Sequence, residues 1–399
     1  MTPRMQFATL RLLVVTFAVL AQLYLFVRIG QAIQAWPRSD VFKSRAIRIV
    51  GLAILVLFVA NLYMMLRPIP WVYPPKAAQL FLFYPPAIWT CGSIFSAFFL
   101  FLTRGLAGTG RKLAGLYGKW AGRTFSQPLD LGRRRFLRAG MGGLAAAPLV
   151  LSGYGAAYAS RDYEIRTLTL PFGHPLTVVQ LSDIHAGLYM NRQQMRRYAD
   201  QVTALQPDLF VLTGDYISNS KLFLPGCLEE MARVRTRYGI FATLGNHEHW
   251  HENLEQLQAN FRKYEIILLQ NAHQVIRTEQ GRFAVAGIDD LMAGRPDLEA
   301  TLSSLEAGIP TILLSHRPEI FPQAAARGVS LTLAGHYHGG QIKLSLPGAD
   351  ISLAHLRTRY PEGLYRIAGS HLYVNRGIGT TFTPVRLNAP PEITRFILL

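Results

Sequence analysis

Five short clusters of side chains that can bind metal ions lie in the C-terminal part of the 399-residue chain. They are Asp183-Ile-His185, Gly214-Asp215, Gly245-Asn246-His247-Glu248, Ser315-His316-Arg317 and Gly335-His336-Tyr337-His338. Imidazole together with carboxylate suits divalent transition metals such as Mn, Fe, Zn or Co, and the clusters contain no cysteine that would favour a structural zinc site. One cluster alone is weak evidence, because a lone His or Asp is usually a loop or capping residue. The five together predict a metal centre.

A short apolar run precedes each cluster, which indicates how the clusters come together. Several runs are apolar throughout, as are strands covered on both faces. Polar stretches with a helical pattern, such as 191–205, alternate with the runs and favour an α/β layered domain. The expected strands are 176–182, 208–213, 239–244, 265–270, 283–287, 310–314 and 329–334. The carboxyl ends of such strands are where α/β sheets build their sites, so we expect the clusters to meet there.

The order of the clusters resembles a known family signature. The set D-x-H, G-D, G-N-H-E, S-H and G-H-x-H, over residues 175–341, is similar to that of the calcineurin-like metallophosphoesterases. The closing stretch NRGIGTTFTPVRLNAPPEI further resembles a bacterial branch of membrane-associated or twin-arginine-exported phosphodiesterases. The resemblance implies a catalytic domain over 161–399 with two mixed β-sheets in a sandwich flanked by helices.

The resemblance also implies a role for each ligand and two divalent metal ions (Mn, Fe, Zn or Co). One ion would be bound by Asp183, His185 and His338, the other by Asn246, His316 and His336, and Asp215 would bridge both. Two such ions would acidify a bridging water to a hydroxide that attacks the phosphorus atom. The implied activity is metal-dependent hydrolysis of phosphate esters.

Two further residues are candidates for the reaction. His247 follows a ligand and would act as the general acid that protonates the leaving oxygen. Arg317 follows another ligand and would bind the substrate phosphate, although an ordinary salt bridge fits it equally well. The stretch GDYISNS has Ser218 where phosphoprotein phosphatases of this superfamily carry an acidic residue. This departure favours a phosphodiesterase over a phosphoprotein phosphatase.

The N-terminal part has a different character. Residues 1–159 carry 18 Lys and Arg against 2 Asp and Glu, whereas 160–399 carry 23 against 22. Within 1–103, three uncharged stretches predict three transmembrane helices: 12–27, 49–66 and 77–103. Their flanks hold two, five, two and nine basic residues in order, which places the N-terminus outside and a basic segment, 104–138, in the cytoplasm. Since the basic residues surround apolar runs, nucleic acid is not an expected partner.

The segment 139–160 has two readings that the sequence leaves open. Arg133-Arg134-Arg135-Phe136-Leu137, followed by a Gly/Ala-rich stretch that ends at Ala159, resembles a twin-arginine signal read by the twin-arginine translocase. A fourth transmembrane helix explains the same residues. Both place the catalytic domain outside.

Together these features predict a multi-pass protein of the bacterial inner membrane with a periplasmic phosphodiesterase that acts on a phosphate ester or phospholipid-like substrate. One alternative is a UDP-2,3-diacylglucosamine-type pyrophosphatase of lipid metabolism, which would need a cytoplasmic active site. The other is a catalytically idle membrane sensor with a metallophosphoesterase shell, against which the complete ligand set counts.

Overall fold

The computed structural model describes residues 3–66, 75–120, 131–159, 161–251 and 253–399. By their internal contacts these residues form two units. The helical unit contains the described residues of 5–66 and 80–154, and the catalytic unit contains those of 155–399 together with the short segments 3–4 and 75–79.

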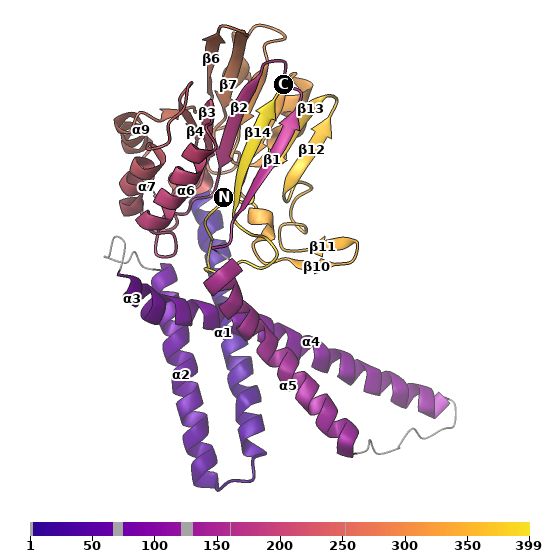
Figure 1. The fold of residues 1–399 in the computed structure, drawn as a ribbon. Helices are drawn as coiled ribbons and strands as arrows, with labels where there is room; N and C mark the ends of the chain where they lie inside the picture. Colours follow the sequence, from indigo (N-terminus) through magenta and orange to yellow (C-terminus); the bar gives the residue numbers. More distant parts are fainter. Residues whose placement is uncertain (1–2, 67–74, 121–130, 160, 252) are drawn as a thin grey trace. The chain divides into compact units, whose positions relative to one another are not determined.

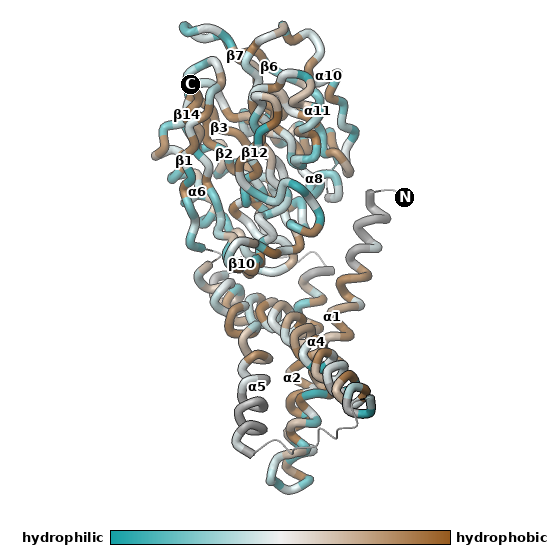
Figure 2. Tube along the Cα trace, turned by 90° about the vertical axis from the view of Figure 1, so that its right-hand side faces the viewer, coloured by the Kyte–Doolittle hydropathy of each residue, from teal (hydrophilic) through white to brown (hydrophobic). Residues whose placement is uncertain are grey.

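The helical unit is built from long apolar helices. Among the described residues, three stretches are long and apolar enough to cross a membrane: Leu12–Gln34, Asp40–Met64 and Gln79–Tyr117. Figure 2 shows these helices largely in the colour of hydrophobic residues. The helices of this N-terminal part are α1 (Pro3–Gln34), α2 (Asp40–Leu66), α3 (Lys76–Ala78), a π-helical turn (Gln79–Phe83), α4 (Tyr84–Trp120) and α5 (Leu131–Tyr154), which continues into a second π-helical turn (Gly155–Ala159).

Helices α4 and α5 pack closely within the helical unit. Gly92 of α4 leaves no room for a side chain, because an added Cβ atom would lie 2.7 Å from the backbone of Leu149. The hydroxyl of Ser96 donates a hydrogen bond to the carbonyl oxygen of Ala145 across the same contact, at 2.7 Å. Small residues therefore let these two helices approach, as in membrane helix pairs.

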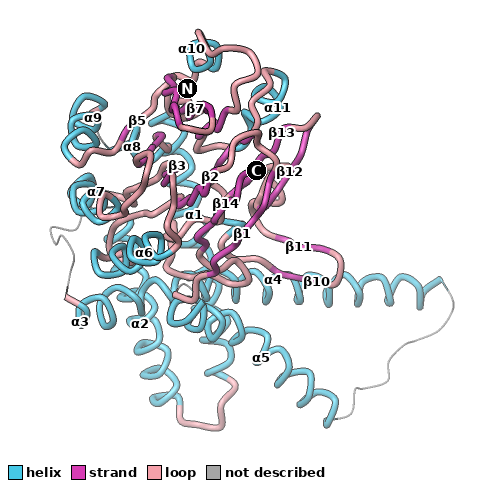
Figure 3. Tube along the Cα trace, turned by 45° about the horizontal axis from the view of Figure 1, so that its top comes forward, coloured by secondary structure: helices cyan, strands magenta, loops and turns pink. Residues whose placement is uncertain are grey.

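The catalytic unit contains two six-stranded mixed sheets among its described residues. The first has the order β1-β14-β2-β3-β4-β5, and the second has the order β12-β13-β9-β8-β7-β6 (Figures 1 and 3). Its strands are β1 (Glu164–Leu170), β2 (Leu176–Leu181), β3 (Leu209–Thr213), β4 (Ile240–Thr243), β5 (Ile267–Leu268), β6 (Ala272–Thr278), β7 (Gly281–Gly287), β8 (Thr311–Leu314), β9 (Leu331–Ala334), β10 (Leu344–Leu346), β11 (Ala349–Ile351), β12 (Gly363–Ile367), β13 (Ser370–Val374) and β14 (Glu392–Leu398).

The two sheets pack face to face over a shared apolar core. Val211 and Phe241 of the first sheet lie in one cluster with Val285 and Leu333 of the second. Helices cover the outer faces: α6, α7 and α9 pack on the first sheet, and α10 and α11 on the second. These helices are α6 (Arg192–Ala204), α7 (Leu224–Met231), α9 (Leu254–Lys263), α10 (Leu298–Leu302) and α11 (Phe321–Ala326). The expected sandwich of mixed sheets flanked by helices is confirmed.

The strands that precede the five clusters are neighbours. Strands β2, β3 and β4 are parallel and adjacent in the first sheet, and β8 and β9 are parallel and adjacent in the second. Because parallel strands end at the same edge, the five loops that carry the clusters meet at one edge of the sandwich.

Candidate metal centre

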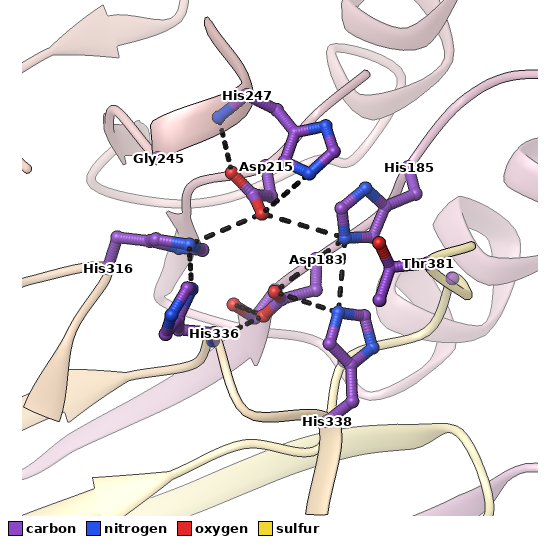
Figure 4. Close-up of polar contacts among 12 residues, drawn as sticks. Asp183, His185, Asp215, Gly245, His247, His316, His336, His338 and Thr381 are labelled. Carbon is purple, nitrogen blue, oxygen red and sulfur yellow. Dashed lines mark hydrogen bonds and ion pairs between the residues drawn. The ribbon is translucent and has the colours of Figure 1, made fainter. Parts of the chain in front are cut away.

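The loops after β2 and β9 form the first group of candidate ligands (Figure 4). His338 Nε2 lies 3.1 Å from His185 Nε2 and 3.2 Å from Asp183 Oδ1. All three side chains are buried, and one ligand atom from each lies within 4.8 Å of the others. This spacing leaves these three side chains able to bind a single ion.

The second group comes from the loops after β3, β8 and β9. His316 Nε2 lies 3.3 Å from Asp215 Oδ2 and 3.1 Å from His336 Nδ1. The other ring nitrogen of His316, Nδ1, donates to the carbonyl oxygen of Thr213 at 2.8 Å, which turns Nε2 toward Asp215. Asp215 Oδ2 also lies 3.6 Å from His185 Nε2 of the first group. Asp215 thus contacts both groups.

His247 is the third residue beside Asp215. Its backbone N–H donates to Asp215 Oδ1 at 3.0 Å, and its Nε2 lies 3.9 Å from Asp215 Oδ2. Its Nδ1 donates to the carbonyl oxygen of Ser218 at 2.5 Å, so Nε2 is the nitrogen that faces the two groups. Burial lowers the pKa of His247, while the charge of Asp215 and the bond to Ser218 oppose that shift.

Arg317 connects Asn246 to the second group. Its Nη2 donates to Asn246 Oδ1 at 3.1 Å, and its Nη1 lies 2.6 Å from His336 Nε2. Asp290 accepts from Arg317 Nε at 3.0 Å and orients the guanidinium. Every residue expected at the site is therefore present at this edge of the sandwich.

The comparisons with known proteins agree with this geometry. A family model described as "Calcineurin-like phosphoesterase" matches residues 176–340. The uncharacterized metallophosphoesterase YkuE of Bacillus subtilis is 32% identical over 67% of this chain and 98% of its own length. This chain belongs to the calcineurin-like metallophosphoesterases.

Two further proteins that are similar to this chain align with only part of their own length. A zebrafish transmembrane protein with a metallophosphoesterase domain is 32% identical over 62% of this chain and 60% of its own length. Among solved structures, the NAD nucleotidase of Haemophilus influenzae aligns over 53% of this chain and 46% of that chain, with 16% identity and a TM-score of 0.37.

The side chains present fit two divalent ions, as in a metallophosphoesterase. Asp183 Oδ1, which lies beside His338 Nε2, is buried without a hydrogen-bond partner among the described residues. Two imidazole nitrogens, those of His185 and His338, face each other beside carboxylates, an arrangement that a cation would stabilise. The donors are nitrogen and oxygen atoms only, which suits Mn, Fe, Zn or Co.

The electrostatics of the site favour ionised carboxylates, neutral imidazoles at His185 and His336, and a protonated imidazole at His316. Burial would raise the pKa of Asp183, but the neighbouring histidines hold it below its usual value. Burial lowers the pKa of His185 to about 3 and that of His336 well below its usual range, so both are neutral and can donate a lone pair. Asp215 raises the pKa of His316 to about 10 against the effect of burial. A metal ion bound there would displace that proton.

Five candidate ligands have unusual backbone conformations. They are Asp183, His185, Asp215, His336 and His338, with φ between +49° and +74°. A non-glycine residue in this left-handed region costs about 1–3 kcal/mol and persists only when its surroundings fix it. Such residues cluster at functional sites, and the site therefore needs side chains that hold these loops.

Glu248 is one such side chain, and its role was not foreseen from the sequence. Its Oε2 accepts from the backbone N–H groups of Gly245 (2.9 Å) and Asp215 (3.0 Å). Its Oε1 accepts from those of Tyr216 (2.8 Å) and Ile217 (3.4 Å). Burial and the charge of Asp215 raise the pKa of Glu248 to about 7, and the N–H groups of Gly245 and Tyr216 together with the charge of His316 oppose this rise. Glu248 fixes the loops that carry Asp215 and Asn246.

We expect Glu248→Gln to destabilise the catalytic unit by about 1–3 kcal/mol, because an amide nitrogen would face backbone N–H donors and leave them unpaired. Thermal unfolding of the full chain in detergent, followed by near-UV circular dichroism, measures this change. Glu279→Gln on the surface is the control. Equal unfolding temperatures for the two variants would contradict the proposed role of Glu248.

Arg386 holds the opposite side of the site. It is fully buried, its Nη2 lies 3.2 Å from His338 Nδ1, and it donates to the carbonyl oxygens of Gly377 and Gly379. An added Cβ on Gly379 would lie 2.2 Å from the carbonyl oxygen of Ile184, so this loop packs directly against the Asp183 loop.

Proposed function

We propose that the chain is a membrane-anchored phosphodiesterase with two divalent ions in its active site. In this proposal the first ion is held by Asp183, His185 and His338, the second by Asn246, His316 and His336, and Asp215 is shared. The observation that carries the proposal is the position of Asp215, whose Oδ2 is 3.6 Å from His185 Nε2 and 3.3 Å from His316 Nε2.

The metal ions, when bound, supply polarisation of the phosphoryl group and an activated water. The chain supplies the rest. His247 Nε2 faces the site and, from the imidazolium form, would pass its proton to the leaving oxygen, which leaves a neutral ring whose Nδ1–H stays on the carbonyl oxygen of Ser218. Arg317, whose Nη atoms contact His336 and Asn246, would offer its remaining Nη–H groups to a non-bridging phosphate oxygen. Its partner Asp290 keeps the fork oriented.

The experiment that tests the proposed function is hydrolysis of bis(4-nitrophenyl) phosphate and of 4-nitrophenyl phosphate by the full chain in detergent. A phosphodiesterase should prefer the diester. Faster hydrolysis of the monoester would contradict the assignment as a phosphodiesterase. Hydrolysis of neither ester would point to the catalytically idle sensor. Metal analysis of the same sample distinguishes an empty site from an inactive one.

The proposed orientation places the catalytic unit outside the cytoplasm. Three helices of sufficient length and the asymmetry of their basic flanks support it. A reporter fused after residue 120 should behave as cytoplasmic, and one fused after Leu399 as exported. The opposite pattern would put the active site in the cytoplasm and favour the UDP-2,3-diacylglucosamine-type pyrophosphatase.

We further propose that the helix before the catalytic unit stays attached to it. The π-helical turn that follows α5 belongs to the catalytic unit: Ala156 is buried, and the carbonyl oxygen of Gly155 accepts from the N–H of Arg386 at 3.4 Å. An added Cβ on Gly155 would lie 2.6 Å from the carbonyl oxygen of Arg386. Cleavage after Ala159 would remove these contacts beside Arg386, which argues for an intact chain.

The twin-arginine translocase remains the proposed export route, and the side chains of Arg133, Arg134 and Arg135 lie outside the described residues. We expect replacement of all three by Lys to retain the catalytic unit in the cytoplasm, because Lys keeps the charge but loses the guanidinium. Protease accessibility in spheroplasts measures the location. Normal export of this variant would instead make 139–159 an ordinary membrane helix.

A further inference from the structure

The hairpin formed by β10 and β11 has an uncovered apolar face close in sequence to the candidate ligands. Leu344 pairs with Ile351 across the hairpin, and Leu346 pairs with Ala349. Because side chains alternate along a strand, these residues share one face, while Ser345 and its neighbours lie on the other. Leu344, Leu346 and Ile351 are 55%, 47% and 46% exposed.

The loop after the hairpin extends this surface. Leu353 and Leu356 are 74% and 77% exposed, among the most exposed large apolar side chains of the catalytic unit. Figures 1 and 3 show β10 and β11 projecting from the catalytic unit. We call Leu344, Leu346, Ile351, Leu353 and Leu356 together the leucine surface.

The base of the hairpin is fixed to the site while its tip is free. The backbone N–H of Lys343 donates to the carbonyl oxygen of Leu387 at 2.9 Å. The backbone N–H of Leu387 in turn donates to the carbonyl oxygen of Gln341 at 2.9 Å. Gly340 lies two residues after His338 and packs against Ser352. A Cβ added to Gly340 would lie 2.0 Å from the hydroxyl oxygen of Ser352. The leucine surface therefore begins beside the loop that carries a candidate ligand.

The charged side chains next to the leucine surface indicate what kind of partner it binds. Arg357 and Arg359 are exposed next to Leu356, and neither has an acidic partner among the described residues. The acidic residues at the base, Asp350 and Glu362, are both paired with Lys343. Exposed leucines beside unpaired arginines are typical of segments that lie in the interface of an anionic bilayer. The chain itself carries helices long and apolar enough to cross such a bilayer.

We propose that the leucine surface inserts into the surface of an anionic lipid bilayer and that the active site takes a phosphodiester of a membrane lipid. This inference rests on the proposed phosphodiesterase function. The leucines would lie at the acyl boundary, Arg357 and Arg359 at the lipid phosphates, and the fixed base of the hairpin would hold the loop of His338 near the headgroups.

A fluorescent label tests the insertion. The full chain, in nanodiscs of phosphatidylcholine and phosphatidylglycerol, is labelled with an environment-sensitive dye at Leu353→Cys, and at Val275→Cys of edge strand β6 as an exposed control. The unsubstituted chain gives the background from Cys91 and Cys227, which are both buried. We expect a blue shift and quenching by doxyl lipids at 353 but not at 275. Identical spectra at both positions would overturn the proposal, as would a shielded label at 353 that lipid does not quench, which indicates a second copy of the chain.

Activity provides the second test. We expect the double variant Leu353→Ser, Leu356→Ser to hydrolyse a diacylglycerol aryl phosphodiester in vesicles about tenfold more slowly, and bis(4-nitrophenyl) phosphate at the normal rate. Leu222→Ser, at a 51% exposed site in the 3-10 helical turn Lys221–Phe223, is the control. Unchanged vesicle activity in the double variant would overturn the lipid proposal alone. Absence of diester hydrolysis in the unsubstituted chain would overturn the phosphodiesterase function beneath it.

Discussion

Asp215→Asn should abolish the centre, with both ions lost and hydrolysis reduced by well over 100-fold. Asp215 Oδ2 lies within 3.3–3.9 Å of His185, His316 and His247, so it is the one carboxylate among the described residues that pairs with imidazole nitrogens of both groups. An amide in its place offers one neutral oxygen and turns an NH₂ group toward the imidazoles. Changes in the outer shell of metal sites alone cost about 10–100-fold, and loss of a shared ligand should cost more.

The measurement is metal content together with the rate on bis(4-nitrophenyl) phosphate, in the full chain. Asp200→Asn, an exposed aspartate on α6, serves as the matched control and should keep both. If Asp215→Asn retained two ions per chain and near-normal turnover, the assignment of Asp215 as the shared ligand would be wrong.

His247→Gln should separate proton transfer from metal binding. We expect the variant to keep its ions, because His247 is assigned to neither metal. Its rate on alkyl diesters should fall by about 10²–10⁴-fold, the usual contribution of a general acid. The rate on nitrophenyl esters should fall far less, because nitrophenolate leaves without protonation.

The plot of rate against leaving-group pKa is the decisive readout for His247. It should become steeper in the variant and stay unchanged in His174→Gln, which alters a histidine bound to Thr278 in a different part of the catalytic unit. An equal loss on alkyl and nitrophenyl esters would show that His247 positions the substrate or the Asp215 loop instead.

The central strands of both sheets were predictable because they are covered on both faces. The apolar runs 176–182, 208–213 and 329–334 correspond to β2, β3 and β9, each of which is buried along almost its whole length. The edge strand β1 has mostly exposed side chains and no continuous apolar run, and it was not predicted. Strand β14 comes last in the chain yet lies between β1 and β2, a pairing that depends on distant residues.

The candidate site shows a similar division. The expected ligands are recognisable because imidazole and carboxylate groups follow buried strands in a familiar order. Glu248 and Arg386 act through the backbone atoms that they hold, and such partners are known only once the loops are placed in space. The left-handed conformations of Asp183 and His338 were equally invisible in the sequence, since either residue type adopts ordinary backbone elsewhere.

The central claim is that two ions together form one catalytic centre. The most direct test is to strip the full chain with a chelator and restore Mn²⁺ or Zn²⁺ stepwise while following both bound metal and the rate on bis(4-nitrophenyl) phosphate. We predict that the rate rises to its maximum only as the second ion per chain binds, and that Asp215→Asn does not recover. Full activity with one ion, or in the stripped chain, would contradict this account.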